Sequence, residues 1–243
     1  MDRVKTGIPG LDNLLGGGLP KGSLTLLSGP SGSLKTIIAG QYIHNGITQY
    51  NEPGIYVTLE ERSDGIRKSL SSFGMDFNRL VEDGKLIMLD LGDIRKKYVF
   101  QTDKYNSVFT SSILIKALAE ATKNMKPARL VIDSLSIIGV LYDNPAAMRE
   151  DLFKLIEYIR DLTATAMLIT EVEERYKDTM VSRFGSEEFL SDGVILLGYT
   201  RAKGEFKRWL SVRKMRFTNH DSDLHPLRLT ENGVEVVATE KLY

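Results

Sequence analysis

Short apolar segments alternate with longer helical patterns along most of the chain, and this alternation restricts the fold more than any other feature of the sequence. The apolar segments, which we expect to be buried strands, are residues 24–27, 55–59, 86–89, 130–132, 167–169 and 194–197. The helical patterns between them are residues 36–47, 64–73, 111–124 and 146–162. Strands joined through helices form parallel pairs, so we predict an α/β fold with a mainly parallel sheet covered by helices on both faces.

The last third of the sequence follows a different pattern. Residues 209–216, 227–230 and 234–237 are expected strands that are joined by turns. These connections leave no room for crossover helices, so the strands should be antiparallel. No low-complexity linker or internal repeat divides the chain. We therefore expect a single domain over residues 1–243.

Composition excludes several classes of site. The chain has 243 residues with no cysteine and three histidines, which excludes disulfides, thiolate zinc sites and cysteine nucleophiles and disfavours a histidine metal site. The apolar segments are too short to cross a bilayer and no signal-peptide pattern is present, so we expect a cytoplasmic protein without a membrane partner. The 32 basic and 32 acidic side chains balance, which argues against a uniformly basic surface for nucleic acid.

A glycine-rich segment connects the expected strand at residues 24–27 to the helical pattern that starts at Ile37. Its sequence, GPSGSLKT from residue 29 to residue 36, matches the phosphate-loop template G-x-x-x-x-G-K-[ST] except at the second glycine. Backbone N–H groups of such a loop and the N-terminus of the helix bind phosphate oxygens. Lys35 is expected to reach the β- and γ-phosphates of ATP, and the Thr36 hydroxyl to bind Mg²⁺. The expected nucleotide-binding residues of this segment are Pro30, Ser31, Gly32, Ser33, Leu34, Lys35, Thr36 and Ile37.

Two alternatives stay open for this segment. A glycine-rich turn between a strand and a helix can also bind nothing. Leu34 occupies the position of the second glycine, where its side chain would either crowd the phosphates or point away from them on the first helical turn. We predict that ATP still binds, either weakly or with slow turnover.

Carboxylates follow two of the expected strands. Asp133 ends the apolar segment 130–132, which is the setting of a Walker B aspartate that binds Mg²⁺, although a helix N-cap is an alternative. Glu60 and Glu61 follow residues 55–59, and one of them is expected to position the attacking water and accept its proton. We prefer Glu60 because it is nearer the strand end. The alternative is a solvated acidic pair next to Arg62.

Together with segments before and after them, these motifs resemble the KaiC-like ATPases of the RecA/RadA superfamily. The matching segments are TGIPGLD at residues 6–12, GGGLPKGS at 16–23, the phosphate loop, LEE at 59–61, SFG at 72–74, VIDS at 131–134, FLSDG at 189–193 and KMRFTNH at 214–220. The resemblance covers nearly the whole chain. It implies a RecA-like P-loop NTPase core in which ATP lies between neighbouring protomers.

The resemblance also implies roles for individual residues. Glu60 and Glu61 match the catalytic carboxylates of the family, Ser72 matches a nucleotide-contacting serine, and Thr230 lies in the segment that approaches the base or ribose. In the family, a K-x-R-x-T-x-H segment contacts the nucleotide of the neighbouring subunit; the matching residues are Lys214, Arg216, Thr218 and His220. Without the resemblance, this segment would be interpreted as the charged end of an edge strand. Phe217 stands where the family usually has glycine, which is expected to reshape the segment.

Three functions remain open at this point. One of them arises because single-domain KaiC-like proteins include archaeal RadA paralogs. The first is a slow Mg²⁺-dependent ATPase whose nucleotide state regulates oligomer contacts or a partner. The second is a RadA paralog that binds single-stranded DNA or a recombinase and modulates homologous recombination and DNA repair. The third is a degenerate nucleotide-binding interaction module. The contacts between subunits imply a homo-oligomer, either a hexamer or a dimer.

Charge distribution bears on the DNA-binding alternative. Residues 171–188, in a region that faces the central channel of RecA-like rings, hold six acidic and three basic side chains, and this net charge of −3 opposes phosphate binding. Basic clusters occur elsewhere, with Tyr98 and Phe100 as nearby aromatic residues. These clusters are Arg95, Lys96, Lys97 and Lys104, and Arg201, Lys203, Lys207 and Arg208. We rank the slow ATPase first and the recombination accessory second.

Overall fold

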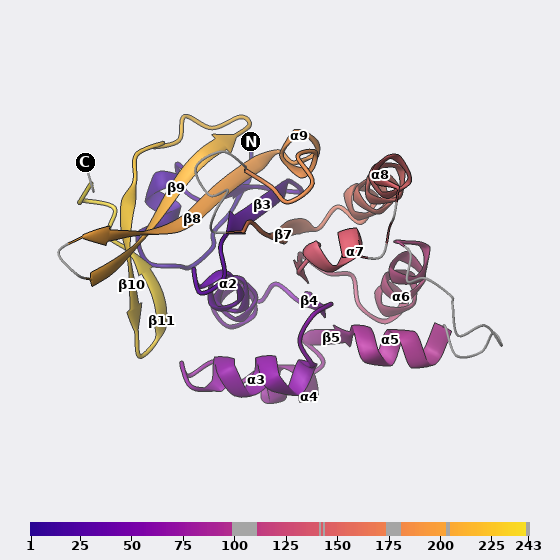
Figure 1. The fold of residues 1–243 in the computed structure, drawn as a ribbon. Helices are drawn as coiled ribbons and strands as arrows, with labels where there is room; N and C mark the ends of the chain where they lie inside the picture. Colours follow the sequence, from indigo (N-terminus) through magenta and orange to yellow (C-terminus); the bar gives the residue numbers. More distant parts are fainter. Residues whose placement is uncertain (99–110, 141, 143, 174–180, 203–204, 242–243) are drawn as a thin grey trace.

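The computed structural model describes residues 1–98, 111–140, 142, 144–173, 181–202 and 205–241 (Figure 1). Its main sheet has nine strands in the order β11-β10-β9-β8-β3-β7-β6-β4-β5. Helices flank this sheet, so the predicted α/β class with a RecA-like core is confirmed.

The parallel part of the sheet carries the most buried strands. It comprises β3 (Leu24–Gly29), β4 (Gly54–Thr58), β5 (Leu86–Asp90), β6 (Arg129–Asp133), β7 (Thr165–Glu171) and β8 (Gly193–Ala202). β3 lies in the middle and pairs in parallel with both β7 and β8. Because parallel strands end at the same edge, the carboxyl ends of β3, β4, β6 and β7 bring their following residues together.

Two hydrophobic clusters cover the two faces of this sheet. One cluster joins strand residues such as Val131 and Met167 to α1 (Leu11–Leu14), α2 (Lys35–Tyr50), α3 (Ser63–Ser71) and α4 (Phe77–Glu82). The other joins the alternate strand residues, such as Leu130 and Leu168, to the remaining helices, which are α5 (Leu91–Tyr98), α6 (Ser111–Asn124), α7 (Ser136–Val140), α8 (Pro145–Asp161) and α9 (Glu187–Leu190). Side chains alternate between the faces of a strand, so each strand contributes to both clusters.

The carboxyl-terminal part of the chain is antiparallel, as the turn spacing predicts. β8 pairs with β9 (Glu205–Met215), β9 pairs with β10 (His225–Thr230), and β10 pairs with β11 (Gly233–Val236). A separate two-stranded sheet forms near the amino terminus from β1 (Arg3–Val4) and β2 (Leu19–Pro20). Within the ranges given above, no helix has the length and apolar character that a membrane span requires.

Candidate functional site

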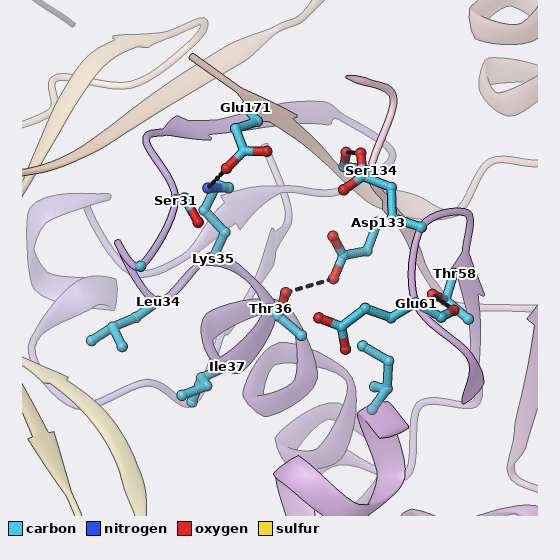
Figure 2. Close-up of a pocket in the computed structure, with 13 residues that line it drawn as sticks. Ser31, Leu34, Lys35, Thr36, Ile37, Thr58, Glu61, Asp133, Ser134 and Glu171 are labelled. Carbon is cyan, nitrogen blue, oxygen red and sulfur yellow. Dashed lines mark hydrogen bonds and ion pairs between the residues drawn. The ribbon is translucent and has the colours of Figure 1, made fainter. Parts of the chain in front are cut away.

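A pocket of about 320 Å³ lies at the carboxyl edge of the sheet (Figure 2). It is bounded by the loop between β3 and α2 and by the residues that end or follow β4, β6 and β7. Its lining residues are Ser31, Gly32, Leu34, Lys35, Thr36, Ile37, Thr58, Glu60, Glu61, Ile66, Asp133, Ser134 and Glu171. The pocket therefore gathers all the predicted carboxylates and the expected phosphate-loop residues other than Pro30 and Ser33.

Most residues of the predicted phosphate loop line this pocket, and the others support the loop from within. Ser31, Gly32 and the residues from Leu34 to Ile37 line the pocket. Ser33 is buried instead, and its hydroxyl donates to the Pro30 carbonyl at 2.7 Å. α2 starts at Lys35, so the free N–H groups of its first turn face the pocket, where an anion is stabilised.

Lys35 is held within the loop. Its ammonium donates to the carbonyls of Gly29 at 2.9 Å and Pro30 at 2.7 Å, and lies 3.8 Å from a carboxylate oxygen of Glu171. Burial lowers the pKa of Lys35, while the nearby charges of Glu171, Asp133 and Glu60 act in the opposite direction. Sequence reasoning placed Glu171 only in an acidic loop. The signal it missed is the position of Glu171 at the end of a buried parallel strand.

Asp133 faces Thr36 across the pocket, as the predicted pairing of these two residues requires. The Thr36 hydroxyl donates to Asp133 Oδ2 at 2.8 Å (Figure 2). The Tyr56 hydroxyl donates to the same oxygen at 2.7 Å. Burial raises the pKa of Asp133, and the hydrogen bonds from Tyr56 and Thr36 oppose this shift. The side chain that accepts a hydrogen bond from the first residue of α7 is Ser134 rather than Asp133, so Asp133 does not cap this helix.

The two glutamates that follow β4 differ in their contacts. Ser134 donates a hydrogen bond of 2.5 Å to Glu60 Oε1, which fixes the Glu60 carboxylate beside the end of β6. The Glu61 carboxylate points toward Thr36 and Asp133 in Figure 2, while its backbone carbonyl accepts a hydrogen bond from Thr58. Both side chains are exposed to the pocket.

The donor set fits Mg²⁺ and the phosphates of a nucleotide. Thr36 and Asp133 supply a hydroxyl and a carboxylate within 2.8 Å of each other. Mg²⁺ prefers oxygen ligands and is commonly held by one or two carboxylates together with substrate phosphates, so a larger cage of protein ligands is not needed. The described ranges contain no cluster of three or more histidine, aspartate or glutamate residues suited to a metal ion.

Two residues that the resemblance suggests as nucleotide contacts lie outside this pocket. Ser72 follows α3, is exposed, and has its hydroxyl 3.4 Å from the Lys68 carbonyl. Thr230 ends β10, where its hydroxyl donates to Gly233 at 2.9 Å. Neither residue lines the pocket of the same chain.

The predicted intersubunit residues lie at the opposite edge of the sheet. Met215, at the end of β9, pairs with Gly193, and Gly193 pairs with Thr25 near the start of β3. The phosphate loop follows the other end of β3, so the six residues of that strand, roughly 20 Å, separate the two groups. The segment from Lys214 to His220 is therefore remote from the pocket of its own chain.

Hydrogen bonds and ion pairs hold this segment in place. Lys214 donates to the carbonyls of Glu188 at 2.9 Å and Ser191 at 2.6 Å, and burial together with the neighbouring Arg216 lowers its pKa. Arg216 pairs with Asp192 at 3.2 Å, and Arg160 pairs with the other oxygen of the same carboxylate at 3.3 Å. His220 Nδ1 lies 3.3 Å from the Thr218 carbonyl. Sequence reasoning did not identify Asp192 or Arg160, because their pairing depends on the tertiary fold.

The basic clusters that bear on DNA binding are only partly described. Phe100 and Lys104 lie outside the described residues, as do Lys203 and the stretch 174–180 of the predicted channel segment, and the side chains of Arg95, Lys96 and Tyr98 are likewise not described. On the β8–β9 hairpin, the Arg201 guanidinium lies 5.9 Å from the centre of the Phe206 ring. Arg208 donates to the Gly32 carbonyl at 3.1 Å, so this arginine belongs to the surroundings of the phosphate loop.

Comparisons with known proteins identify the family that this chain resembles. Residues 4–241 match the family model described as "ATPase: KaiC". The chain is 35% identical to the circadian clock oscillator protein KaiC of Parathermosynechococcus lividus and 34% identical to that of Synechococcus elongatus, in each case over 96% of this chain. These matches span 42% and 44% of the two cyanobacterial proteins, which is less than half their length. The crystal structure of a KaiC-like protein from Pyrococcus horikoshii OT3 superimposes with a TM-score of 0.84 and 35% identity, over 97% of this chain and 98% of that one.

Proposed function

The chain belongs to the KaiC family of ATPases, and from this premise we propose that it binds ATP with Mg²⁺ in the pocket at the carboxyl edge of the sheet and hydrolyses it slowly, at a site that a neighbouring subunit completes. The observation that carries the proposal is the 2.8 Å contact between Thr36 and Asp133 next to the phosphate loop. This contact supports the proposal because a hydroxyl and a carboxylate, which are ligand types that Mg²⁺ accepts, line the same pocket as Lys35, the residue that would neutralise the phosphates. A glycine-rich turn without a ligand would not need a lysine, a threonine hydroxyl and an aspartate side by side.

Five of the lining residues have a proposed role in such a reaction. Thr36 and Asp133 would hold the Mg²⁺ ion, which when bound neutralises negative charge on the phosphate oxygens. Lys35 and the first N–H groups of α2 would bind those oxygens as fixed donors. Glu60 or Glu61 would orient the attacking water and accept its proton. We assign this role first to Glu60, because the hydrogen bond from Ser134 fixes its carboxylate.

The proposed rate is slow because of Leu34. This residue has a φ of 75° and a ψ of 20°, in the left-handed region that disfavours residues with a Cβ atom. Its side chain points away from Lys35 and Asp133 in Figure 2 and packs against the cluster beneath α2. The loop is therefore less free to adjust its backbone around phosphates than a loop with glycine at this position. Slow turnover would allow the bound nucleotide to regulate oligomer contacts or a partner.

The position of the Lys214–His220 segment supports completion of the site by a second subunit. Since the segment lies at the opposite edge of the sheet from its own pocket, its cations can act on a nucleotide only in another copy of the chain. Such contacts require a head-to-tail arrangement, which closes into a ring or extends into a filament. We propose a homo-oligomer built on this contact.

Nucleotide titration and measurement of phosphate release would test the proposal. Lys35→Ala should weaken ATP binding, and Glu60→Gln should retain binding but lower kcat by at least roughly a hundredfold. Glu61→Gln, measured in parallel, distinguishes the two carboxylates, and Arg79→Gln on the exposed side of α4 serves as a control for surface charge. Full hydrolysis in both glutamate variants would refute the catalytic assignment. Hydrolysis that survives Lys35→Ala would refute the site itself, whereas ATP binding without any hydrolysis in the native chain would favour an interaction module.

Single-stranded DNA is the second candidate ligand, and the pairing of Arg201 with the exposed Phe206 ring is the observation that favours it. Less basic surface remains for DNA than the sequence suggests, because Arg208 bonds to the Gly32 carbonyl. Binding of a labelled single strand over a range of salt concentrations, with and without ATP, would test this candidate. A DNA-binding surface predicts affinity that falls steeply with salt.

A further inference from the structure

The amino-terminal strand β1 carries an arginine that contacts the segment following β9. Arg3 Nη2 donates to the Phe217 carbonyl at 2.8 Å, and Arg3 Nη1 donates to the Thr218 hydroxyl at 2.6 Å. The same Nη1 group lies 3.2 Å from the carbonyl of Gly18 and 3.4 Å from that of Leu15. One guanidinium therefore connects β1, the residues that follow α1 and the segment after β9.

The turn that Arg3 contacts, which includes Leu15 and Gly18, packs closely against the backbone of β1. At Gly18, which has a φ of 125°, a Cβ atom would lie 2.4 Å from the Val4 carbonyl oxygen. Only glycine permits the backbone of β1 to approach this turn so closely. The segment after β9 is attached to the same region by a second bond, from the backbone N–H of Asp221 to the Leu14 carbonyl at 3.1 Å. Residues 217–221 are thus docked on the turn that follows α1.

Phe217 has the least favourable backbone conformation in this segment, so contacts that stabilise this conformation matter most there. Its φ of 59° lies in the left-handed region, which is unfavourable for a residue with a Cβ atom. Its side chain is 72% exposed, so packing contributes little to holding this conformation. The Arg3 contact to the Phe217 carbonyl acts directly on the strained peptide. Arg216, the residue before it, is anchored separately by Asp192.

We propose that Arg3 is a positioning residue for the intersubunit contacts: it holds Phe217 and Thr218 in the conformation from which Arg216 and Thr218 reach the nucleotide site of a neighbouring subunit. This inference rests on the proposed function, because it requires that the segment acts on another copy of the chain. Arg3 does not line the pocket of its own chain. Its loss therefore weakens the site of the neighbour and leaves the chain's own phosphate loop and carboxylates intact.

The side-chain chemistry at this position is specific to arginine. Phe217, Thr218 and Gly18 present three oxygen atoms in different directions, and a planar guanidinium with five donors spans them. A lysine ammonium has three donors on a single atom and cannot reach all three oxygens together. Arg3→Lys should thus retain part of the effect and Arg3→Gln almost none.

Mixing two defective variants separates positioning from general stability. Arg3→Gln alone is expected to lower kcat for ATP hydrolysis at least tenfold with little change in KM, because misplacing a transition-state contact affects the chemical step. Lys35→Ala alone lacks a working phosphate loop but has an intact 214–220 segment. In an equimolar mixture, roughly a quarter of head-to-tail interfaces combine a working loop with an intact segment. Hydrolysis should therefore reappear at about a quarter of the native rate in the mixture, estimated from the same interface statistics.

Controls make each outcome decisive. Arg216→Ala mixed with Lys35→Ala should recover activity in the same way, and Arg79→Gln should hydrolyse ATP like the native chain. If the Arg216→Ala mixture recovers and the Arg3→Gln mixture does not, the positioning role of Arg3 is wrong, and the intersubunit assignment stands. If neither mixture recovers, the intersubunit assignment fails and the role of Arg3 with it. If circular dichroism shows that Arg3→Gln is unfolded, Arg3→Lys enters the same assay, and failure to recover there refutes the proposal.

Discussion

Two residues with a left-handed backbone define what is unusual about this chain. Leu34 has a φ of 75° and Phe217 a φ of 59°, and the resemblance to KaiC-like proteins gives glycine as the usual residue at both positions. The backbone conformation expected for glycine is kept, although each residue now carries a Cβ atom and pays about 1–2 kcal/mol for it. One of these residues lies in the phosphate loop and the other in the proposed intersubunit segment. Leu34 and Phe217 thus lie one in each half of the proposed site.

Replacing Leu34 with glycine should accelerate the proposed reaction. The left-handed conformation would become unstrained, so the loop could adjust its N–H groups around the phosphates. We expect Leu34→Gly to raise either ATP affinity or kcat a few-fold, as measured by nucleotide titration and by steady-state phosphate release. Leu34→Ala keeps a Cβ atom in the left-handed region and should show no such gain. An equal gain in both variants would mean that side-chain bulk, rather than backbone strain, limits the native loop, and no gain in either would exclude Leu34 as the cause of slow turnover.

Tyr56 should control the pH dependence of the proposed Mg²⁺ ligand. Its hydroxyl donates to Asp133 Oδ2 at 2.7 Å and so favours the ionised carboxylate, whose pKa burial raises. Removing this donor in Tyr56→Phe raises the pKa of Asp133 further, because the charged form loses a hydrogen bond. Since the ionised form binds Mg²⁺, the acid limb of the kcat/KM profile for ATP hydrolysis should move to higher pH.

A matched variant checks this assignment. Tyr42 is also fully buried, and its hydroxyl donates to the Thr165 carbonyl at 2.9 Å, away from the pocket. Tyr42→Phe should lower stability by about 1 kcal/mol, as expected for one lost hydrogen bond, and leave the pH profile in place. An unchanged acid limb in Tyr56→Phe would show that ionisation of Asp133 does not limit hydrolysis at low pH.

At the scale of helices and strands, the long elements follow from sequence periodicity and the short ones do not. The predicted helix at residues 111–124 matches α6, and the prediction for 146–162 differs from α8 by one residue at each end. The helices α1, α4, α7 and α9 have four to six residues each, which is too few turns to give a recognisable period. β8 and β9 extend well beyond the strands predicted from the sequence. Polar residues at the exposed end of the β8–β9 hairpin still pair with residues of the opposite strand.

The packing of α2 against Arg129 shows why the local sequence of a helix does not predict how that helix packs. Arg129, at the start of β6, is fully buried and bonds to Glu52 and to the carbonyls of Tyr42 and Lys5. A Cβ atom on Gly46 would lie 2.2 Å from its Nε atom, so α2 can cover this arginine only because residue 46 is glycine. Glycine weakens a helix by about 1 kcal/mol relative to alanine, and its presence here is explained only by a residue 83 positions away in the sequence.

At the scale of the whole molecule, strand direction decides which predicted site residues can meet. The phosphate loop, the Glu60–Glu61 pair and Asp133 all follow parallel strands, so sequence patterns alone predict that they share one edge of the sheet. Tyr56 was not predicted, because a tyrosine within an apolar strand is indistinguishable from a core residue. Asp192 and Arg160 were missed for a related reason, since their ion pair forms between α8 and the residue preceding β8. The antiparallel return of β9 places the Lys214–His220 segment at the other edge, so the role that we propose for these residues requires two chains.

This requirement predicts that hydrolysis depends on protein concentration. A single chain contains the phosphate loop and the carboxylates but presents Lys214 and Arg216 roughly one strand length away from them. ATP turnover per chain should therefore rise with concentration over the range in which light scattering, recorded with ATP present, shows assembly. Arg216→Ala should assemble over a similar range but show little rise in turnover, because its interfaces lack the cation that stabilises the transferred phosphoryl group. Constant turnover per chain in the native protein, from the assembled state down to dilutions at which scattering reports monomers, would show that one chain holds the complete catalytic site.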